Sequence, residues 1–200
     1  MIALLLSMSS CGNNKVYSRA QDVVKQLATA TNKAKSSSDL LNAIETFDGL
    51  ADRDDFDLYE LLYGKNPSTE ITDEERAELT ETLKKTLQNF AAKQQEVGDD
   101  GGSLIYLACK KELEKCQRDI YEIEDYEDLK DFEEDLYDEI IFSALWEDWF
   151  VDNDINLSGL SNSENEKLMK SIDEMVSNAT AKLKKEKALQ ALEDEEDDDY

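Results

Sequence analysis

The side chains with the clearest chemical potential are oxygen-bearing residues at alternate positions between two predicted helices. Asp152, Asp154, Asn156 and Ser158 share this spacing. Calcium, a hard cation, takes carboxylate and carbonyl oxygens as ligands, so the segment is a weak candidate for a calcium loop. Such a loop needs Gly where Leu157 stands and a bidentate Glu where Ser163 stands. The alternative interpretation is therefore an ordinary polar loop between helices.

Acidic residues dominate the segment 119–154, which holds 16 of them against one basic residue, Lys130. Aromatic residues are interspersed with them, among them Tyr121, Tyr126, Phe132, Tyr137, Trp146 and Trp149. Charge of this density attracts basic proteins and cations, which predicts a docking face for a basic partner protein or a mimic of nucleic acid. The alternative is a solvated helix face whose aromatic side chains are buried in the core.

Composition argues against other chemistry. The chain has no His, which removes the most common general base and the usual zinc and haem ligands. Acidic pairs are so frequent that none stands out as a catalytic pair with separated pKa values. A net charge of -26 disfavours binding to nucleic acid, because phosphates need Lys and Arg. We therefore expect no enzyme, no nucleic acid partner and no cofactor apart from the calcium candidate.

Two cysteines, Cys109 and Cys116, lie seven residues apart on one predicted helix. That spacing separates them by about 10 Å along a helix axis. A disulfide needs Cα atoms within about 7 Å, so the two cannot pair inside an unbroken helix. Either the helix is broken, or both residues are small buried thiols.

The amino-terminal residues have a different character. An apolar run from Ile2 to Leu6 is followed by small residues and Cys11. Met8-Ser9-Ser10-Cys11 resembles the lipobox of bacterial lipoprotein signal peptides, in which a Leu and two small residues precede the cysteine. The resemblance implies that residues 1–10 are removed and that Cys11 carries acyl groups such as palmitate. The alternative is a hydrophobic amino terminus that packs on the core.

Other properties of this segment bear on the start of translation. No Lys or Arg precedes the apolar run, and the run is shorter than the usual stretch of about 7–15 residues, which favours a start upstream of Met1. The chain after Cys11 also resembles, in style alone, the uncharacterised small helical lipoproteins of Bacteroidetes, and this resemblance assigns no residue a role.

Helices must position these residues, because apolar side chains recur at spacings of three and four along most of the chain. Capping boxes at Thr72–Glu75 and Ser163–Glu166 predict two helix starts. Seven Gly and one Pro are too few for a turn-rich β-sandwich or barrel. The sequence predicts an all-α fold of five to six amphipathic helices in two antiparallel helical sub-bundles.

Composition divides the chain, since residues 1–98 hold 11 basic and 16 acidic residues, a net of -5, and residues 99–200 hold 11 and 32, a net of -21. The predicted organisation is a signal peptide at 1–10, truncated at its amino end if translation starts upstream, a tether at 11–16, a helical sub-bundle at 17–97, a linker at 98–102, an acidic helical sub-bundle at 103–192 and a disordered acidic tail at 193–200.

These observations lead to one functional expectation and one alternative. We expect a membrane-anchored, non-enzymatic acidic lipoprotein that acts as an interaction or structural module in the cell envelope, at the outer membrane. The alternative is a soluble acidic protein that binds cations or mimics nucleic acid and carries no lipid. The state of Cys11 separates the two.

Overall fold

A computed structural model describes residues 15–64, 70–98, 101–142, 145–157 and 159–197. The fold is all-α, as the sequence predicts. Eight α-helices, two short 3-10 helices and one two-stranded sheet occur among these residues: α1 (Lys15–Lys33), α2 (Ser37–Ala51), β1 (Asp52–Arg53), β2 (Phe56–Asp57), α3 (Leu58–Tyr63), α4 (Asp73–Val97), α5 (Leu104–Asp119), η1 (Ile120–Glu122), α6 (Tyr126–Phe142), η2 (Leu145–Glu147), α7 (Asp148–Val151) and α8 (Asn162–Asp197). The number exceeds the expected five to six because α3 and α7 have only six and four residues.

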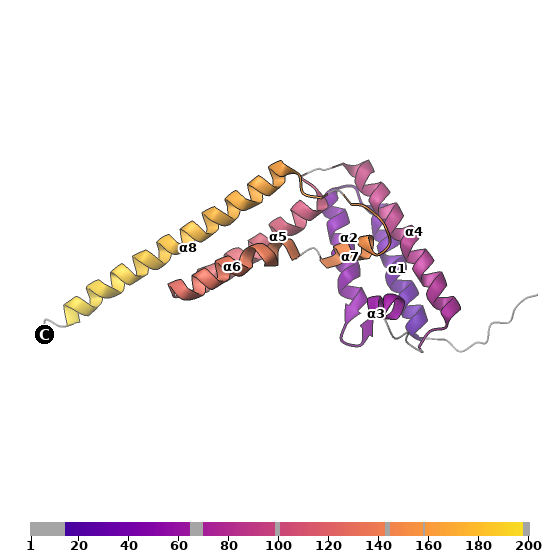
Figure 1. Cartoon of the computed structure of the whole chain (residues 1–200), viewed down its shortest axis with the longest axis horizontal. Helices are drawn as coiled ribbons and strands as arrows, with labels where there is room; N and C mark the ends of the chain where they lie inside the picture. Colours follow the sequence, from indigo (N-terminus) through magenta and orange to yellow (C-terminus); the bar gives the residue numbers. More distant parts are fainter. Residues whose placement is uncertain (1–14, 65–69, 99–100, 143–144, 158, 198–200) are drawn as a thin grey trace, which may run out of the picture.

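Helices α1, α2 and α4 pack together, and α3 contacts α4 (Figure 1). Their apolar faces meet in a core whose largest fully buried side chains include Leu27 of α1, Phe47 of α2 and Phe90 of α4. Capping residues set the helix boundaries. Ser36 accepts a hydrogen bond from the backbone N–H of Asp39, and Thr72 and Glu75 form the predicted capping box.

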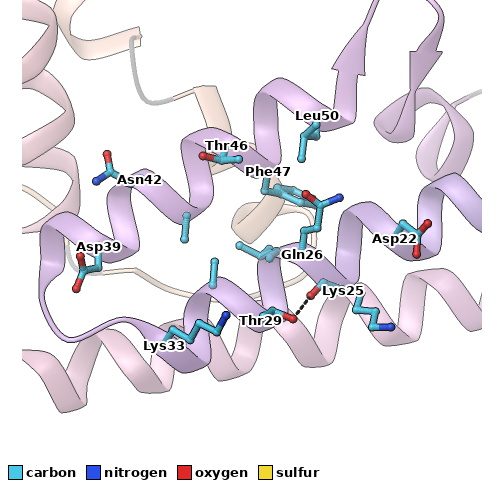
Figure 2. Close-up of a pocket in the computed structure, with 13 residues that line it drawn as sticks. Asp22, Lys25, Gln26, Thr29, Lys33, Asp39, Asn42, Thr46, Phe47 and Leu50 are labelled. Carbon is cyan, nitrogen blue, oxygen red and sulfur yellow. Dashed lines mark hydrogen bonds between the residues drawn. The ribbon is translucent and has the colours of Figure 1, made fainter.

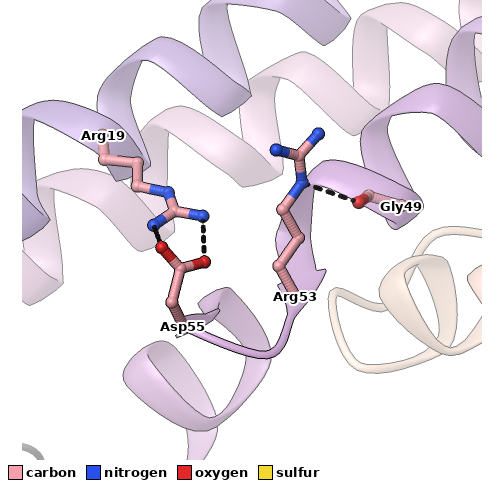
Figure 3. A network of polar contacts seen from close by, with 4 residues as sticks. All are labelled: Arg19, Gly49, Arg53 and Asp55. Atoms are coloured by element: carbon pink, nitrogen blue, oxygen red, sulfur yellow. Dashed lines mark hydrogen bonds and ion pairs between the residues drawn. The ribbon is translucent and has the colours of Figure 1, made fainter.

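A short β-hairpin follows α2, where the sequence shows a break in the helical pattern but no strand signal. Strands β1 and β2 pair antiparallel, and the turn between them carries Asp55. Arg19 of α1 donates two hydrogen bonds of 2.8 Å to the Asp55 carboxylate, and its guanidinium lies 4.4 Å from the centre of the Phe56 ring (Figure 3). Arg53 of β1 donates to the backbone oxygen of Gly49 near the end of α2. Arg19 therefore holds the hairpin against α1.

The remaining long helices form an arm that leaves this bundle (Figure 1). Helix α5 leads outward, α6 returns beside it, and α8 runs outward again in contact with both. Lys182 of α8 donates to the backbone oxygen of Tyr121, and Lys187 lies 4.5 Å from the centre of the Tyr126 ring. Helix α8 continues to Asp197, into the segment 193–200 for which the run of acidic residues predicts disorder.

Packing crosses the linker predicted at 98–102. Helix α5 contacts α2, and α7 brings two aromatic side chains from the second half of the chain onto the first. The Trp149 ring meets Phe47 of α2 edge-on at 5.1 Å between centroids, and the Phe150 ring lies 5.3 Å from Phe90 of α4. The segment 145–151 therefore lies on the amino-terminal bundle, although the sequence assigns it to the acidic sub-bundle.

The start of α8 differs from the prediction. Ser161, and not Ser163, caps the helix: its backbone N–H and hydroxyl donate to the Glu164 carboxylate at 2.8 Å, and its hydroxyl accepts from the Glu164 N–H. The capping box predicted at Ser163–Glu166 is wrong, because the helix begins at Asn162, two residues earlier than that box requires. Glu164 also accepts a 2.6 Å hydrogen bond from the backbone N–H of Ser103, the N-cap residue of α5. One carboxylate thus joins the starts of two helices.

We expect Glu164→Gln to destabilise the protein by about 1 kcal/mol at neutral pH, because the amide weakens three charge-assisted hydrogen bonds. Burial raises the pKa of Glu164, but the hydrogen bonds from Ser103 and Ser161 outweigh it and hold the pKa below its usual value. A lowered carboxyl pKa stabilises the fold above the unfolded pKa, and this contribution is lost as the pH falls through the folded pKa.

Thermal unfolding at pH 7 and in acid measures this difference. The matched control is Glu166→Gln, which removes the same charge from an exposed position on the same helix. Equal midpoints for the two variants at pH 7 would show that Glu164 does not join the helices.

Candidate functional site

The candidate calcium loop is the carboxyl-terminal cap of α7. The N–H of Asp154 donates to the oxygen of Val151, and the N–H of Ile155 donates to the oxygen of Phe150. These two bonds define a Schellman motif, which places one residue in the left-handed region. Asp154 occupies it, with a φ of 58°. The alternating polar residues thus end a helix, at a position where Gly or Asn is usual.

The side chains of this loop have separate roles. Asp152 accepts a hydrogen bond from the Tyr59 hydroxyl, and this bond, with burial, raises the pKa of Tyr59 to about 12. Buried Asn153 donates to the Tyr63 hydroxyl at 2.9 Å and to the backbone oxygen of Trp149 at 2.8 Å.

The proposed ligands can be placed in part. Asp152, Asp154 and Asn156 are exposed, and Ser158 lies outside the described residues. Among the residues that are described, no group of three or more Cys, Asp or Glu side chains is placed to hold a metal ion. Calcium at this loop stays a prediction.

We expect Asp154→Gly to raise the thermal midpoint, since the left-handed conformation costs a residue with a Cβ about 1 kcal/mol that Gly does not lose. Asn156→Gly, two residues further on, is the control, because it adds the same chain flexibility without relieving a left-handed residue. Thermal unfolding of both variants is the measurement. A lower midpoint for Asp154→Gly than for Asn156→Gly would contradict the assignment of Asp154 as the cap.

The acidic face is the second candidate, and the structure places it along the arm. The acidic side chains described on and just before α6 are exposed: Glu124, Asp125, Glu127, Asp128, Asp131, Glu133 and Asp135. Asp125 caps α6 by accepting from the N–H groups of Glu127 and Asp128 at 2.8 and 2.9 Å. Its charge is the main reason that the pKa of the Asp128 carboxyl is raised. Like charges thus crowd one surface.

Of the aromatic residues interspersed with these acids, Phe132 is half-buried, and the side chain of Tyr137 is not among those described. Trp146 and Trp149 are buried, with 2% and 4% of their surfaces exposed, whereas Tyr121 and Tyr126 are exposed. The tryptophans belong to the core, as the structural interpretation of the sequence expects. Lys187 of α8 lies over the Tyr126 ring, and Lys182 donates to the backbone oxygen of Tyr121.

A groove between α1 and α2 was not anticipated from the sequence. It has a volume of about 660 Å³, and Figure 2 shows its two walls. Apolar Leu27 and Phe47 line it, together with Lys25 and Lys33 of α1. The signal that could have found it is a stripe of polar residues at helical spacing on α1, formed by Asp22, Lys25, Thr29 and Lys33.

Two of the three cysteines lie in the described part of the chain, on helix α5. Helix α5 is unbroken through Cys109 and Cys116, both are buried, and neither forms a disulfide. Burial raises the pKa of the Cys109 thiol, which leaves it protonated and unreactive at neutral pH. Cys11, the predicted lipidation site, lies outside the described residues.

Comparison of the chain with protein-family models, with curated proteins and with solved structures finds no match. Within the described ranges, every helix is too short or too polar to cross a bilayer.

Proposed function

We propose that this protein is a lipid-anchored, non-enzymatic module of the bacterial cell envelope, held at the outer membrane by acyl groups on Cys11. In this proposal its acidic arm serves as the docking surface for a basic partner protein. The observation that carries the proposal is the lipobox-like segment Met8-Ser9-Ser10-Cys11, followed at once by a folded helical domain.

The distance from the anchor to the fold supports the proposal. Helix α1 begins at Lys15, four residues after Cys11. Four residues span at most about 14 Å when extended. An acylated Cys11 would therefore keep the amino-terminal bundle close to the bilayer surface.

The length of the arm supports the proposal that its acidic surface binds a basic partner protein. Helix α8 has 36 residues, which corresponds to a length of about 54 Å. The acidic face of α6 lies beside it, on the part of the molecule that leaves the bundle (Figure 1). A surface with this charge speeds the approach of basic proteins and repels nucleic acid. A protein partner that carries Lys and Arg is the occupant that this surface fits.

We expect labelled palmitate to enter the protein when the native gene, with any upstream start, is expressed in a bacterial host. Cys11→Ser should lose the label and leave the membrane fraction, because two or more acyl chains are needed for stable anchoring. Cys109→Ala, which removes a buried thiol of the same chain, should keep both.

Radioactivity in the protein band and its distribution between membrane pellet and supernatant are the readouts. Equal label in the native protein and Cys11→Ser, or a native protein that stays in the supernatant, would refute the lipid anchor.

A further inference from the structure

Helix α1 has the opposite charge to the rest of the protein. It holds four basic residues, Lys15, Arg19, Lys25 and Lys33, and one acidic residue, Asp22. Another lysine, Lys35, follows the helix. The chain as a whole has a net charge of -26, of which -21 comes from residues 99–200. The first helix is therefore a basic element at the amino-terminal end of an acidic protein.

The lysines of α1 lie on one exposed face. Lys15, Lys25 and Lys33 are all exposed, and they line the grooves on the α2 side of the helix. Among the described residues, no carboxylate forms an ion pair with any of these three lysines. Arg53 of β1 stands on the same side and adds a fourth cation. We call Lys15, Lys25, Lys33 and Arg53 the basic face.

Acidic residues also lie near the basic face, and two of them are held by other groups. Asp39, at the start of α2, accepts a 2.9 Å hydrogen bond from the backbone N–H of Lys35. This hydrogen bond lowers the pKa of the Asp39 carboxyl and holds the carboxyl against the backbone. Asp55, at the hairpin turn, pairs with Arg19. Asp22 stays exposed among the lysines, and exposed Glu78 of α4 lines a groove together with Asp22 and Lys25.

We propose that the basic face lies on the surface of an anionic phospholipid bilayer and so orients the protein on the membrane. The inference rests on the proposed function, since the lipid on Cys11 brings the protein to the bilayer. Charge complementarity and the short connection from Cys11 to Lys15 carry it. The arm contacts the bundle through α2, and Lys15, Lys25 and Lys33 of α1 are exposed.

Electrostatic range explains how a protein of such negative charge has an anionic partner. Salt at 0.1 M screens exposed charges beyond about 10 Å, so the acids along the arm do not cancel lysines that touch the headgroups. The net charge still repels the bilayer from a distance. The basic face therefore orients a protein that is already anchored, and it does not recruit the free protein.

The test supplies the anchor chemically. The full-length protein is coupled through Cys11 to a maleimide lipid, since Cys109 and Cys116 are buried. It is then bound to vesicles of phosphatidylcholine alone or of phosphatidylcholine with phosphatidylglycerol. An amine-reactive reagent labels exposed lysines, and mass spectrometry measures the rate at each lysine. We expect slower labelling of Lys25 and Lys33 on the anionic vesicles, while Lys167 and Lys170 of α8 react equally on both.

Charge reversal gives the matched comparison. Each lysine at an anionic surface contributes about a fivefold preference, so Lys25→Glu with Lys33→Glu should weaken docking by more than about 25-fold and abolish the protection of Lys15. Lys167→Glu with Lys170→Glu, which changes the total charge equally on α8, should keep that protection. High salt should remove the protection of Lys15 from labelling in every variant that shows this protection.

Equal labelling of the α1 lysines on both kinds of vesicle, or loss of protection in both double variants, would overturn the inference. Because the maleimide lipid replaces the natural anchor, this result is independent of whether Cys11 is acylated in cells. A failure of palmitate labelling with intact protection would refute the lipid anchor alone.

Discussion

The whole arrangement depends on the way Trp149 seats the acidic half of the chain on the amino-terminal bundle. Its ring lies edge-on to Phe47 and Tyr59, at 5.1 and 5.3 Å between centroids, and its indole N–H donates to the Asp48 carboxylate at 2.9 Å. Burial raises the pKa of Asp48, although this hydrogen bond opposes the shift. Helix α7 connects the α6 and α8 regions of the arm. The contacts of α7 with the bundle therefore fix the positions at which both regions leave the bundle.

Repulsion between negative charges destabilises this arrangement. Apolar contacts and a few positively charged side chains counteract the repulsion. The arm holds most of the net negative charge, and the repulsion is visible where Asp125 raises the pKa of Asp128. Lys182 and Lys187 of α8 contact Tyr121 and Tyr126 beside these acids. The buried apolar stripe of α8 then faces α5 and α6. The two proposed contacts follow from these charges. The basic face is proposed to contact the bilayer, and the acidic arm is proposed to bind a protein partner.

The helices were predictable because their apolar spacing and caps are local, as Ser36 and the Thr72–Glu75 box show. The hairpin was missed because Arg19 stabilises its turn from another helix. The position of Trp149 was missed for the same reason, since it follows from partners about a hundred residues away. The Asp152–Asn156 spacing has two interpretations in sequence, and only the backbone conformation of Asp154 assigns a helix cap. The sequence shows the lysines of α1, but their position on one exposed face could not be predicted from it.

Calorimetric unfolding of Trp149→Ala tests the joint between arm and bundle most directly. The control is Val151→Ala, which changes an exposed residue of the same helix. The native protein and the control should unfold in one cooperative transition. Removing the buried ring should cost about 3–5 kcal/mol and separate the unfolding of the arm from that of the bundle into two transitions. A single transition for Trp149→Ala at the native midpoint would contradict the central role of this residue.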